Sequence, residues 1–110
     1  MVILEKQNYI YSFDKEHKPA LKVSAGAKVV IETHDCFLGQ IDSEETAYEA
    51  IDWNHINPAT GPIYIEEAKA GDILKVKIDD LEIAPTGIIA TCENLGVMGH
   101  RLEGFAVKKV

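Results

Sequence analysis

Short stretches of alternating apolar and polar residues dominate the chain, and they constrain its fold more than any other feature. In one of them, Leu74, Val76 and Ile78 alternate with charged residues, which is typical of a strand with one buried and one solvated face. Similar β-prone stretches lie at residues 9–13, 21–23, 28–33, 63–66, 88–92 and 104–110. Turn-forming glycines separate several of these stretches. The pattern predicts a mainly β fold, built as an antiparallel β-sandwich or partial barrel.

One short helix is expected across the end of a sheet, at residues 43–51. Ser43 can cap it, and acidic residues follow in the first turn, where the helix dipole favours negative charge. Tyr48 and Ile51 then fall on one face at helical spacing. The sequence therefore predicts a single helical element in an otherwise β-rich fold.

The length of 110 residues suffices for one small domain and is too short for two, so we expect a single β-rich domain over residues 1–110. The net charge of −7 argues against nucleic acid or an anionic membrane as a partner. No apolar run approaches the ~20 residues that span a bilayer, and residues 1–8 do not resemble a secretory signal. Cys36 and Cys92 are then expected as reduced thiols in a cytoplasmic protein.

The first group of candidate site residues is His34-Asp35-Cys36, followed by Gly39 and Gln40, where a predicted strand gives way to a loop. His, Asp and Cys all bind zinc, but neighbours on a strand point to opposite faces, so at most two of the three could serve as ligands. The structural interpretation is a strand end at which Asp35 caps backbone amides and Cys36 fills the core. Both interpretations remain open from spacing alone.

The second group is the loop Asn57-Pro58-Ala59-Thr60-Gly61-Pro62. Its two prolines restrict the chain on either side and make the loop stiff. The amides of Ala59, Thr60 and Gly61 could then point at the oxygen of a small ligand and stabilise a developing oxyanion. A rigid corner between two elements is the structural alternative.

The only tryptophan, Trp53, is expected to anchor a small satellite core beneath a long loop. His55 lies between Trp53 and the proline loop, a place from which it could line a pocket. The chain contains no GxSxG, HExxH, P-loop or CxxC motif, so neither group can be assigned by a standard signature.

Taken together, these pieces resemble the opening of acetamidase/formamidase proteins. The order and spacing of the matching segments agree over residues 9–84. The matching segments are His17-Lys18-Pro19-Ala20, the strand KVVIET, Asp35-Cys36, Gly39-Gln40-Ile41, NPATGPIYIE, Ala70-Gly71-Asp72 and LKVKIDDLEI. Each piece alone is weak, and the combination is specific.

The resemblance implies a β-sandwich-rich fold that hydrolyses small linear amides, such as formamide and acetamide, to a carboxylate and ammonia. It also implies a divalent metal such as zinc in some members. We take Asp35 and Gln40 as catalytic candidates, and Asp35 and His34 as candidate metal ligands. Asn57, Thr60 and Gly61 are the candidate substrate-binding residues.

The chain also departs from the family. Family members are much longer, and downstream they carry glycine-rich segments with His, Asp and Glu residues that nothing here matches. The resemblance fades after Leu81. The chain is therefore a fragment, one chain of a split enzyme or a truncated relative, and we expect a second chain or a homo-oligomer. Two alternatives stay open: a non-catalytic β-sandwich that oligomerises through an open sheet edge, and a small metal-binding sandwich that uses His34 or Cys36.

Overall fold

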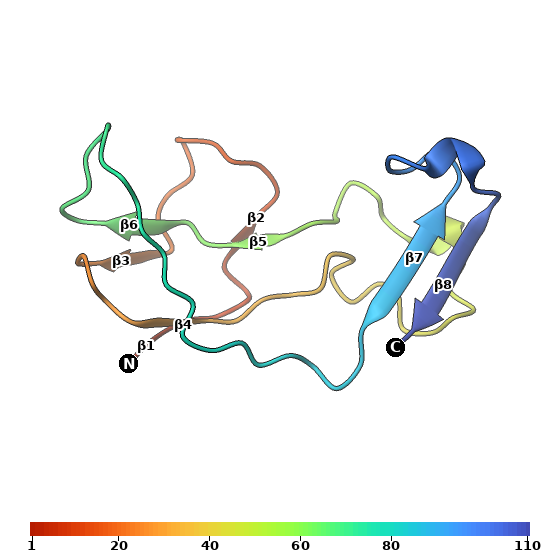
Figure 1. Cartoon of the computed structure of the whole chain (residues 1–110), viewed down its shortest axis with the longest axis horizontal. Coiled ribbons are helices and arrows are strands. Elements are labelled where there is room, and N and C mark those ends of the chain that lie inside the picture. Colours follow the sequence, from red (N-terminus) through yellow and green to blue (C-terminus); the bar gives the residue numbers. More distant parts are fainter. The chain divides into compact units, whose positions relative to one another are not determined.

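The fold, a computed structural model that describes all of residues 1–110, is mainly β and contains four two-stranded sheets (Figure 1). The parallel pairs are β1 (Val2–Leu4) with β4 (Val29–Ile31), and β3 (Leu21–Val23) with β6 (Ile63–Ile65). The antiparallel pairs are β2 (Tyr9–Ile10) with β5 (Ala59–Thr60), and β7 (Ile88–Cys92) with β8 (Phe105–Lys109). The mainly β prediction is confirmed.

The expectation of an antiparallel arrangement holds for only two of the four pairs. In β1 and β4 every residue is apolar, and the register places Val2 beside Val29, Ile3 beside Val30, and Leu4 beside Ile31. Continuous apolar strands of this kind are typical of parallel pairing, whereas alternation is typical of antiparallel sheets. The continuous apolar run Val29–Ile31 therefore indicated parallel pairing, which the prediction based on alternating residues did not take into account.

The predicted helix at residues 43–51 is wrong. The structure contains no α-helix, only the 3-10 turns η1 (Tyr48–Ala50) and η2 (Gly99–Arg101). The N-cap of η1 is Ala47 rather than Ser43, and no side chain caps it. A helix of nine residues is too short to be stable through its own hydrogen bonds, so side-chain packing decides the local conformation. No helix in the structure is long and apolar enough to cross a membrane.

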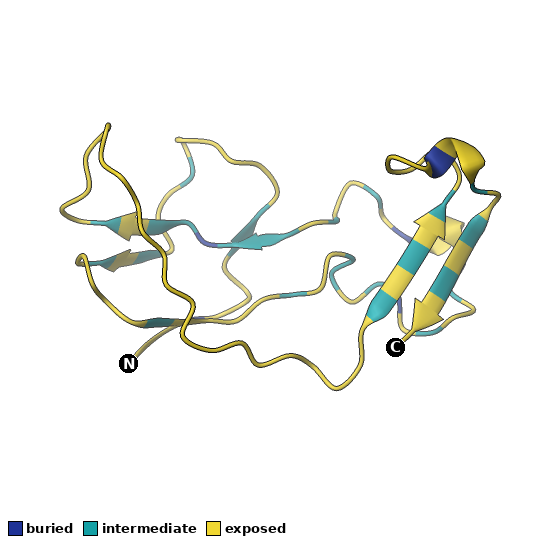
Figure 2. Cartoon of the chain, in the orientation of Figure 1, coloured by how far each residue is buried: buried dark blue, intermediate teal, exposed yellow.

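The predicted strand at residues 74–78 is also absent. These residues belong to no sheet, and their apolar side chains are exposed, so the expected buried face does not form here (Figure 2). A strand needs a neighbour to receive its backbone hydrogen bonds, and the pattern of alternation alone does not supply one. The alternation in the sequence therefore predicted a strand for residues 74–78, but the structure pairs them with no neighbouring strand.

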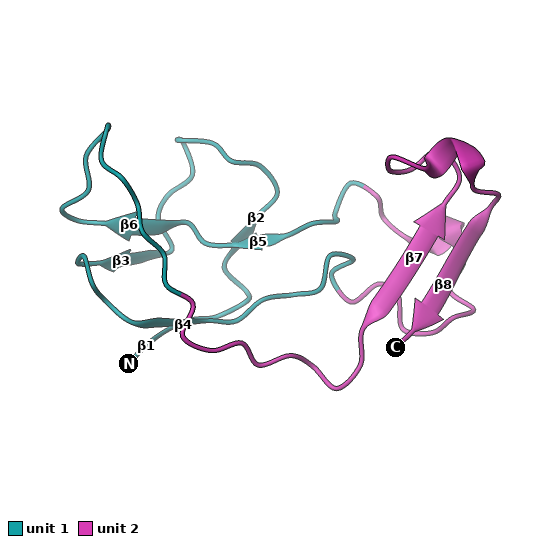
Figure 3. Ribbon diagram, in the orientation of Figure 1, with its two compact units in different colours: residues 1–38, 54–77 teal, residues 39–53, 78–110 magenta.

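The chain divides into two compact units (Figure 3). The first comprises residues 1–38 and 54–77, and the second residues 39–53 and 78–110. Leu4 is the buried apolar residue of the first unit, and Ile41 and Ile51 are those of the second. A single domain over residues 1–110 stays a prediction.

The second unit has a cluster of aromatic rings, formed by Tyr48, Trp53 and Phe105. The centroid of the Trp53 ring lies 4.8 Å from that of Tyr48 and 6.2 Å from that of Phe105. The indole N–H of Trp53 also donates a hydrogen bond to the carbonyl oxygen of Tyr48 at 3.2 Å. Ring contacts of this kind combine apolar burial with a preferred geometry. The satellite core expected around Trp53 is confirmed.

Candidate functional site

Asp35 begins a tight turn four residues after the end of β4. Its Oδ1 atom accepts a hydrogen bond from the amide of Phe37 at 2.7 Å, and its carbonyl oxygen accepts one from the amide of Leu38 at 3.1 Å. Leu38 and Gly39 have positive φ angles of 54° and 72°, which turn the chain sharply. The capping role of the structural interpretation is therefore confirmed for Asp35. The expectation that Cys36 fills the core is wrong, because Cys36 is exposed.

Two hydrogen bonds tie the proline loop to the segment that carries Asp35. The amide of Asn57 donates to the carbonyl oxygen of Cys36 at 2.6 Å, and Thr60 Oγ1 donates to the carbonyl oxygen of Glu32 at 2.7 Å. Asn57 has a positive φ of 57°, a conformation that asparagine adopts more readily than most residues. The structure thus brings the part of the first group around Asp35 together with the proline loop, from which it is well separated in sequence.

The backbone amides of the proline loop are not all available to a ligand, contrary to expectation. The amide of Gly61 donates to the carbonyl oxygen of Asn8 at 2.9 Å, and Ala59 lies in the β2–β5 ladder. Opposed residues in an antiparallel ladder alternate between bonded and non-bonded pairs. The pair of Thr60 with Tyr9 follows the bonded pair of Gly61 with Asn8, so the amide of Thr60 points away from β2. Of the three amides, that of Thr60 is the one suited to a ligand.

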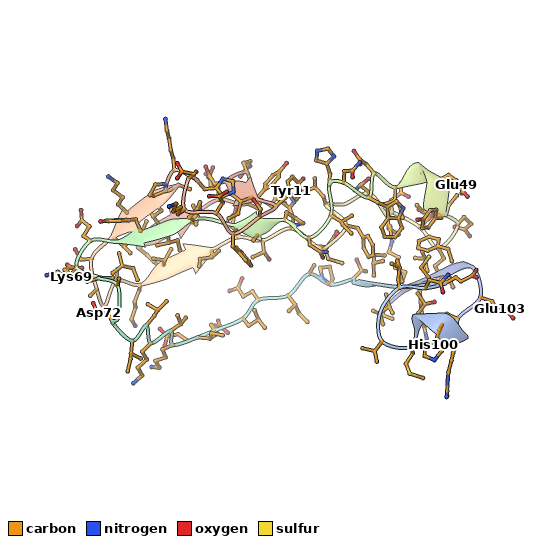
Figure 4. The ribbon with its side chains drawn as sticks, turned by 90° about the horizontal axis from the view of Figure 1, so that it is seen from above. Tyr11, Glu49, Lys69, Asp72, His100 and Glu103 are labelled. Carbon is orange, nitrogen blue, oxygen red and sulfur yellow. The ribbon has the colours of Figure 1, made fainter.

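A row of ring contacts in the first unit links His34 of the first candidate group to His55, which precedes the proline loop. Tyr9 makes edge-on ring contacts with His34 at 5.4 Å and with Tyr11 at 5.5 Å between centroids. Tyr11, labelled in Figure 4, makes a similar contact with His55 at 5.4 Å. Sequence reasoning did not connect these tyrosines to the site. The signal was present in their spacing, because residues two apart on an extended chain point to the same side.

Gln40 belongs to the second unit, where it holds the backbone of Asp52. Its Nε2 donates to the carbonyl oxygen of Asp52 at 3.3 Å, and the amide of Asp52 donates to its Oε1 at 2.7 Å. Both ends of the side-chain amide are used, and the two buried residues Ile41 and Ile51 lie within the loop that these bonds close. The contacts give Gln40 a structural role, and its catalytic role stays a prediction.

The environment of Cys36 does not favour a nucleophilic thiolate. Desolvation by surrounding atoms, followed by the negative charge of Asp35, raises the pKa of the Cys36 thiol above its ordinary value of 9.0. The thiolate is the reactive form of cysteine, and a raised pKa depletes it near neutral pH. The chemistry available in this loop is therefore that of a carboxylate and of amide donors.

The residues of this chain do not form a complete zinc site by themselves. Structural and catalytic zinc ions take at least three protein ligands. No group of three or more His, Cys, Asp or Glu side chains is placed to hold a metal ion. His34 and Asp35 remain the predicted metal ligands.

Known proteins similar to this chain provide independent evidence. A sequence profile of the Acetamidase/Formamidase family matches residues 4–106. The crystal structure of an acetamidase from Bacillus halodurans is 39% identical, with a TM-score of 0.92, and the match covers 98% of this chain and 37% of that chain. The crystal structure of a predicted acetamidase/formamidase from the thermophile Thermoanaerobacter tengcongensis is 48% identical, with a TM-score of 0.91, and the match covers 99% of this chain and 36% of that chain. The chain therefore spans about a third of the length of these proteins. None of the curated protein sequences matches it.

Proposed function

Because the chain belongs to the acetamidase/formamidase family, we propose that it forms one part of an amide hydrolase. The proposed substrates are small linear amides of the formamide and acetamide type, cleaved to a carboxylate and ammonia. Since the chain spans about a third of its structural relatives, the remaining catalytic groups are proposed to come from a second segment or chain. Use of a divalent metal such as zinc and a cytoplasmic location belong to the same proposal.

Amide hydrolysis needs an activated water or nucleophile, a stabiliser for the oxyanion and an acid for the leaving amine. In this proposal the amide of Thr60 and the side chain of Asn57 donate hydrogen bonds to the substrate oxygen. The carboxylate of Asp35 accepts a hydrogen bond from the substrate N–H, which orients the amide. The activating base and the acid lie on the missing part, because this chain offers no convincing nucleophile and base pair.

The observation that supports this assignment most is the pair of hydrogen bonds between the proline loop and the Asp35 segment. The bonds from Asn57 to Cys36 and from Thr60 to Glu32 measure 2.6 and 2.7 Å. They join the backbone on either side of Asp35 to the loop that carries Asn57 and Thr60, within one unit of the fold. Fixed donors and acceptors of this kind favour catalysis because they need little reorganisation when charge develops.

The experiment that tests the proposal is ammonia release from formamide and acetamide by the purified chain, measured alone, with added zinc and with the missing part of a relative. We expect release only when the missing part is present. Release by the chain alone would show that its own residues suffice. No release under any of the three conditions would contradict the proposal.

A matched pair of variants separates a role in substrate binding from a role in the loop. Asp35→Asn keeps an oxygen that can accept from Phe37, but it removes the charge. Asp14 forms the same kind of turn, since its Oδ1 accepts from the amide of Glu16 at 2.9 Å, so Asp14→Asn is the control. We expect Asp35→Asn to reduce ammonia release by about 100-fold and Asp14→Asn to leave it unchanged. Equal effects would show that Asp35 acts on the fold only.

A second candidate function is a non-catalytic subunit that oligomerises through an open sheet edge. It is favoured by the exposed apolar residues of the β1–β4 pair, namely Val2, Ile3, Val30 and Ile31. Parallel strands are normally covered on both faces, so an uncovered pair invites association. Gel filtration of the purified chain tests this candidate, and a clean monomer would count against it.

A further inference from the structure

The register of the β7–β8 ladder in the second unit decides which backbone groups of β7 face outward (Figure 1). At one end of the ladder, Gly87 and Val110 exchange hydrogen bonds of 2.7 and 2.9 Å. At the other end, the amide of Glu93 donates to the carbonyl oxygen of Gly104 at 2.8 Å. Because bonded and non-bonded pairs alternate along an antiparallel ladder, every second residue between these ends points its amide and carbonyl away from β8. The outward-facing residues of β7 are Ile88, Ala90 and Cys92.

Most of the outward backbone groups of β7 form no hydrogen bond within the chain. The amides of Ile88, Ala90 and Cys92 have no acceptor, and the carbonyl oxygens of Ile88 and Ala90 have no donor. The carbonyl oxygen of Cys92 accepts from the amide of Leu95 at 3.2 Å. The side chains of β7 do not protect this edge, because the strand contains neither a charged residue nor a proline. Unpaired backbone groups along an uncharged strand are suited to receive another strand.

The opposite edge of the same sheet, formed by β8, is protected. By the same alternation the amide of Lys109 points away from β7, and it donates to Oε1 of Glu44 at 2.9 Å. Lys108 and Lys109 also place charge at the end of this strand. Lysines on an edge, and a loop that covers it, are two means by which proteins prevent a sheet from pairing further. The two edges therefore differ, and β7 forms the open one.

The β7–β8 sheet is small, although one of its faces is already packed. Half-buried and exposed residues alternate along β7, and the half-buried Phe105 of β8 contacts the rings of Tyr48 and Trp53. Two-stranded sheets are marginal in water, and the sheets of globular proteins usually contain about four to six strands. A further strand beside β7 would extend a sheet that already has a core on one side.

The relatives and the distribution of charge indicate which polypeptide supplies this strand. The matches cover 98% and 99% of this chain but only 37% and 36% of the related chains, so most of each relative lies outside the matched part. A second copy of this chain is a less suitable occupant. The second unit contains ten acidic and three basic residues, whereas the first contains eight of each. The whole net charge of −7 therefore lies in the unit that carries β7, and two such units repel each other.

We propose that the outer edge of β7 is the docking site for a strand of the polypeptide that corresponds to the rest of the related chains. That strand accepts hydrogen bonds from the outward amides of β7 and donates to its outward carbonyl oxygens, which adds a third strand to the sheet. This inference rests on the proposed function, since it names the place where the missing part of the hydrolase attaches. It concerns association through the main chain and makes no claim about chemistry.

The test uses the full 110-residue chain and, as the probe, the part of the Thermoanaerobacter tengcongensis protein that this chain does not cover. The two polypeptides are co-expressed and analysed by gel filtration, and the exchange of single amides is followed by nuclear magnetic resonance. We expect co-elution, and exchange of the amides of Ile88 and Ala90 that is slower by about tenfold or more. The amides of Ile89 and Thr91 already face β8, so their exchange should change less. No co-elution would overturn the proposal, and so would co-elution without slower exchange of Ile88 and Ala90.

Two proline variants distinguish the edge of β7 from the edge of β8. Ala90→Pro removes an outward donor, and the amides that bond to β8 are retained. Val107→Pro makes the same change at the cross-strand partner of Ala90, on the outer edge of β8, and is the matched control. We expect Ala90→Pro to weaken association by about tenfold or more and Val107→Pro to leave it unchanged. An equal loss in both variants would overturn the assignment to β7.

Slow exchange of the Ile89 and Thr91 amides shows whether the hairpin still folds in Ala90→Pro. If it does not fold, Ile88→Pro takes its place, because proline is tolerated at the first residue of a strand. Unchanged association in a proline variant of β7 whose hairpin folds would overturn the proposal. The exchange of the parent chain with the probe decides the matter independently of both variants.

Three further outcomes separate this inference from its alternatives. If the chain alone forms a dimer in which the amides of Ile88 and Ala90 exchange slowly, the occupant is a second copy and the proposal is wrong. If the probe docks at β7 but no ammonia is released, the docking site stands and the catalytic proposal fails. Ammonia release without slower exchange at β7 would leave the catalytic proposal standing and overturn the docking site.

Discussion

Different interactions stabilise each of the two units internally. The second unit contains the five-residue hairpin pair β7–β8 and the ring cluster around Trp53. The first unit contains three ladders of only two or three residue pairs, joined by hydrogen bonds between loops. Short two-stranded ladders are marginal in water unless other elements cover them.

The candidate site lies in the unit with the weaker internal packing. Asp35, Asn57 and Thr60 all belong to the first unit, whose shape depends on a few hydrogen bonds. Binding and catalytic loops are commonly drawn from regions of low local stability. The first unit is therefore expected to open more readily in hydrogen exchange than the second.

The largest effect is expected for Trp53→Ala in the second unit. The variant loses the ring contacts with Tyr48 and Phe105 and the hydrogen bond from the indole. We expect the free energy of unfolding to fall by about 3 kcal/mol. Urea denaturation followed by circular dichroism measures it, with Trp53→Phe as the control that keeps a ring and loses about 1 kcal/mol. If Trp53→Ala reduced the hydrogen-exchange protection of β2 and β5 in the first unit as much as that of the second unit, the two units would not differ as described.

Gly99→Ala is expected to have the next largest effect, again in the second unit. A Cβ atom at this position would lie 2.6 Å from the backbone carbonyl carbon of Asn94, which cannot move aside cheaply. We expect a loss of about 2 kcal/mol in the free energy of unfolding. Gly87→Ala is the control, because its new Cβ would meet only a side-chain atom of Val110 at 3.6 Å. Equal stability of Gly99→Ala and Gly87→Ala would show that the turn at residues 94–99 adjusts freely.

Local strand character could be predicted from the sequence, and strand partners could not. The strands at residues 21–23, 63–65, 88–92 and 105–109 follow from their β-prone residues and flanking turns. The parallel pairing of β1 with β4 depends on a contact across 27 positions of the chain, which no local pattern specifies. The failed strand at residues 74–78 has the same cause, since alternation indicates a strand but does not specify a partner for it.

Only part of the candidate site could be predicted from the sequence, for a similar reason. The turn at Asp35 was accessible from sequence, because an aspartate at a strand end commonly accepts backbone hydrogen bonds. The bond from Asn57 to Cys36 was not, because it joins loops from separate elements. The two hydrogen bonds between the Gln40 side chain and the Asp52 backbone could not be predicted either, since the sequence does not indicate whether a glutamine binds a ligand or the backbone.

Thr60→Val tests a hydrogen bond of the first unit. Its effect on the free energy of unfolding is expected to be smaller than those of the two variants in the second unit. The variant keeps the shape of the side chain and removes the hydroxyl that donates to Glu32 at 2.7 Å. We expect a loss of about 1 kcal/mol in the free energy of unfolding, together with faster exchange of the amides near Asn57. Thr60→Ser retains the donor and should stay close to the parent chain. No change in Thr60→Val would show that this bond does not hold the proline loop in place.

The smallest effect concerns the titration of Cys36 beside Asp35. Desolvation and then the Asp35 carboxylate raise the pKa of the thiol above 9.0, so the folded chain holds this proton more tightly than the unfolded chain. The resulting contribution to stability is present below about pH 9 and is lost as the pH rises through the folded pKa. Asp35→Asn removes the charge and is expected to lower the pKa of Cys36. Ultraviolet absorbance of the thiolate measures it, and Cys36→Ser identifies the signal that belongs to Cys92. An unchanged pKa in Asp35→Asn would mean that desolvation alone sets it, and that the carboxylate does not act on the thiol across the turn.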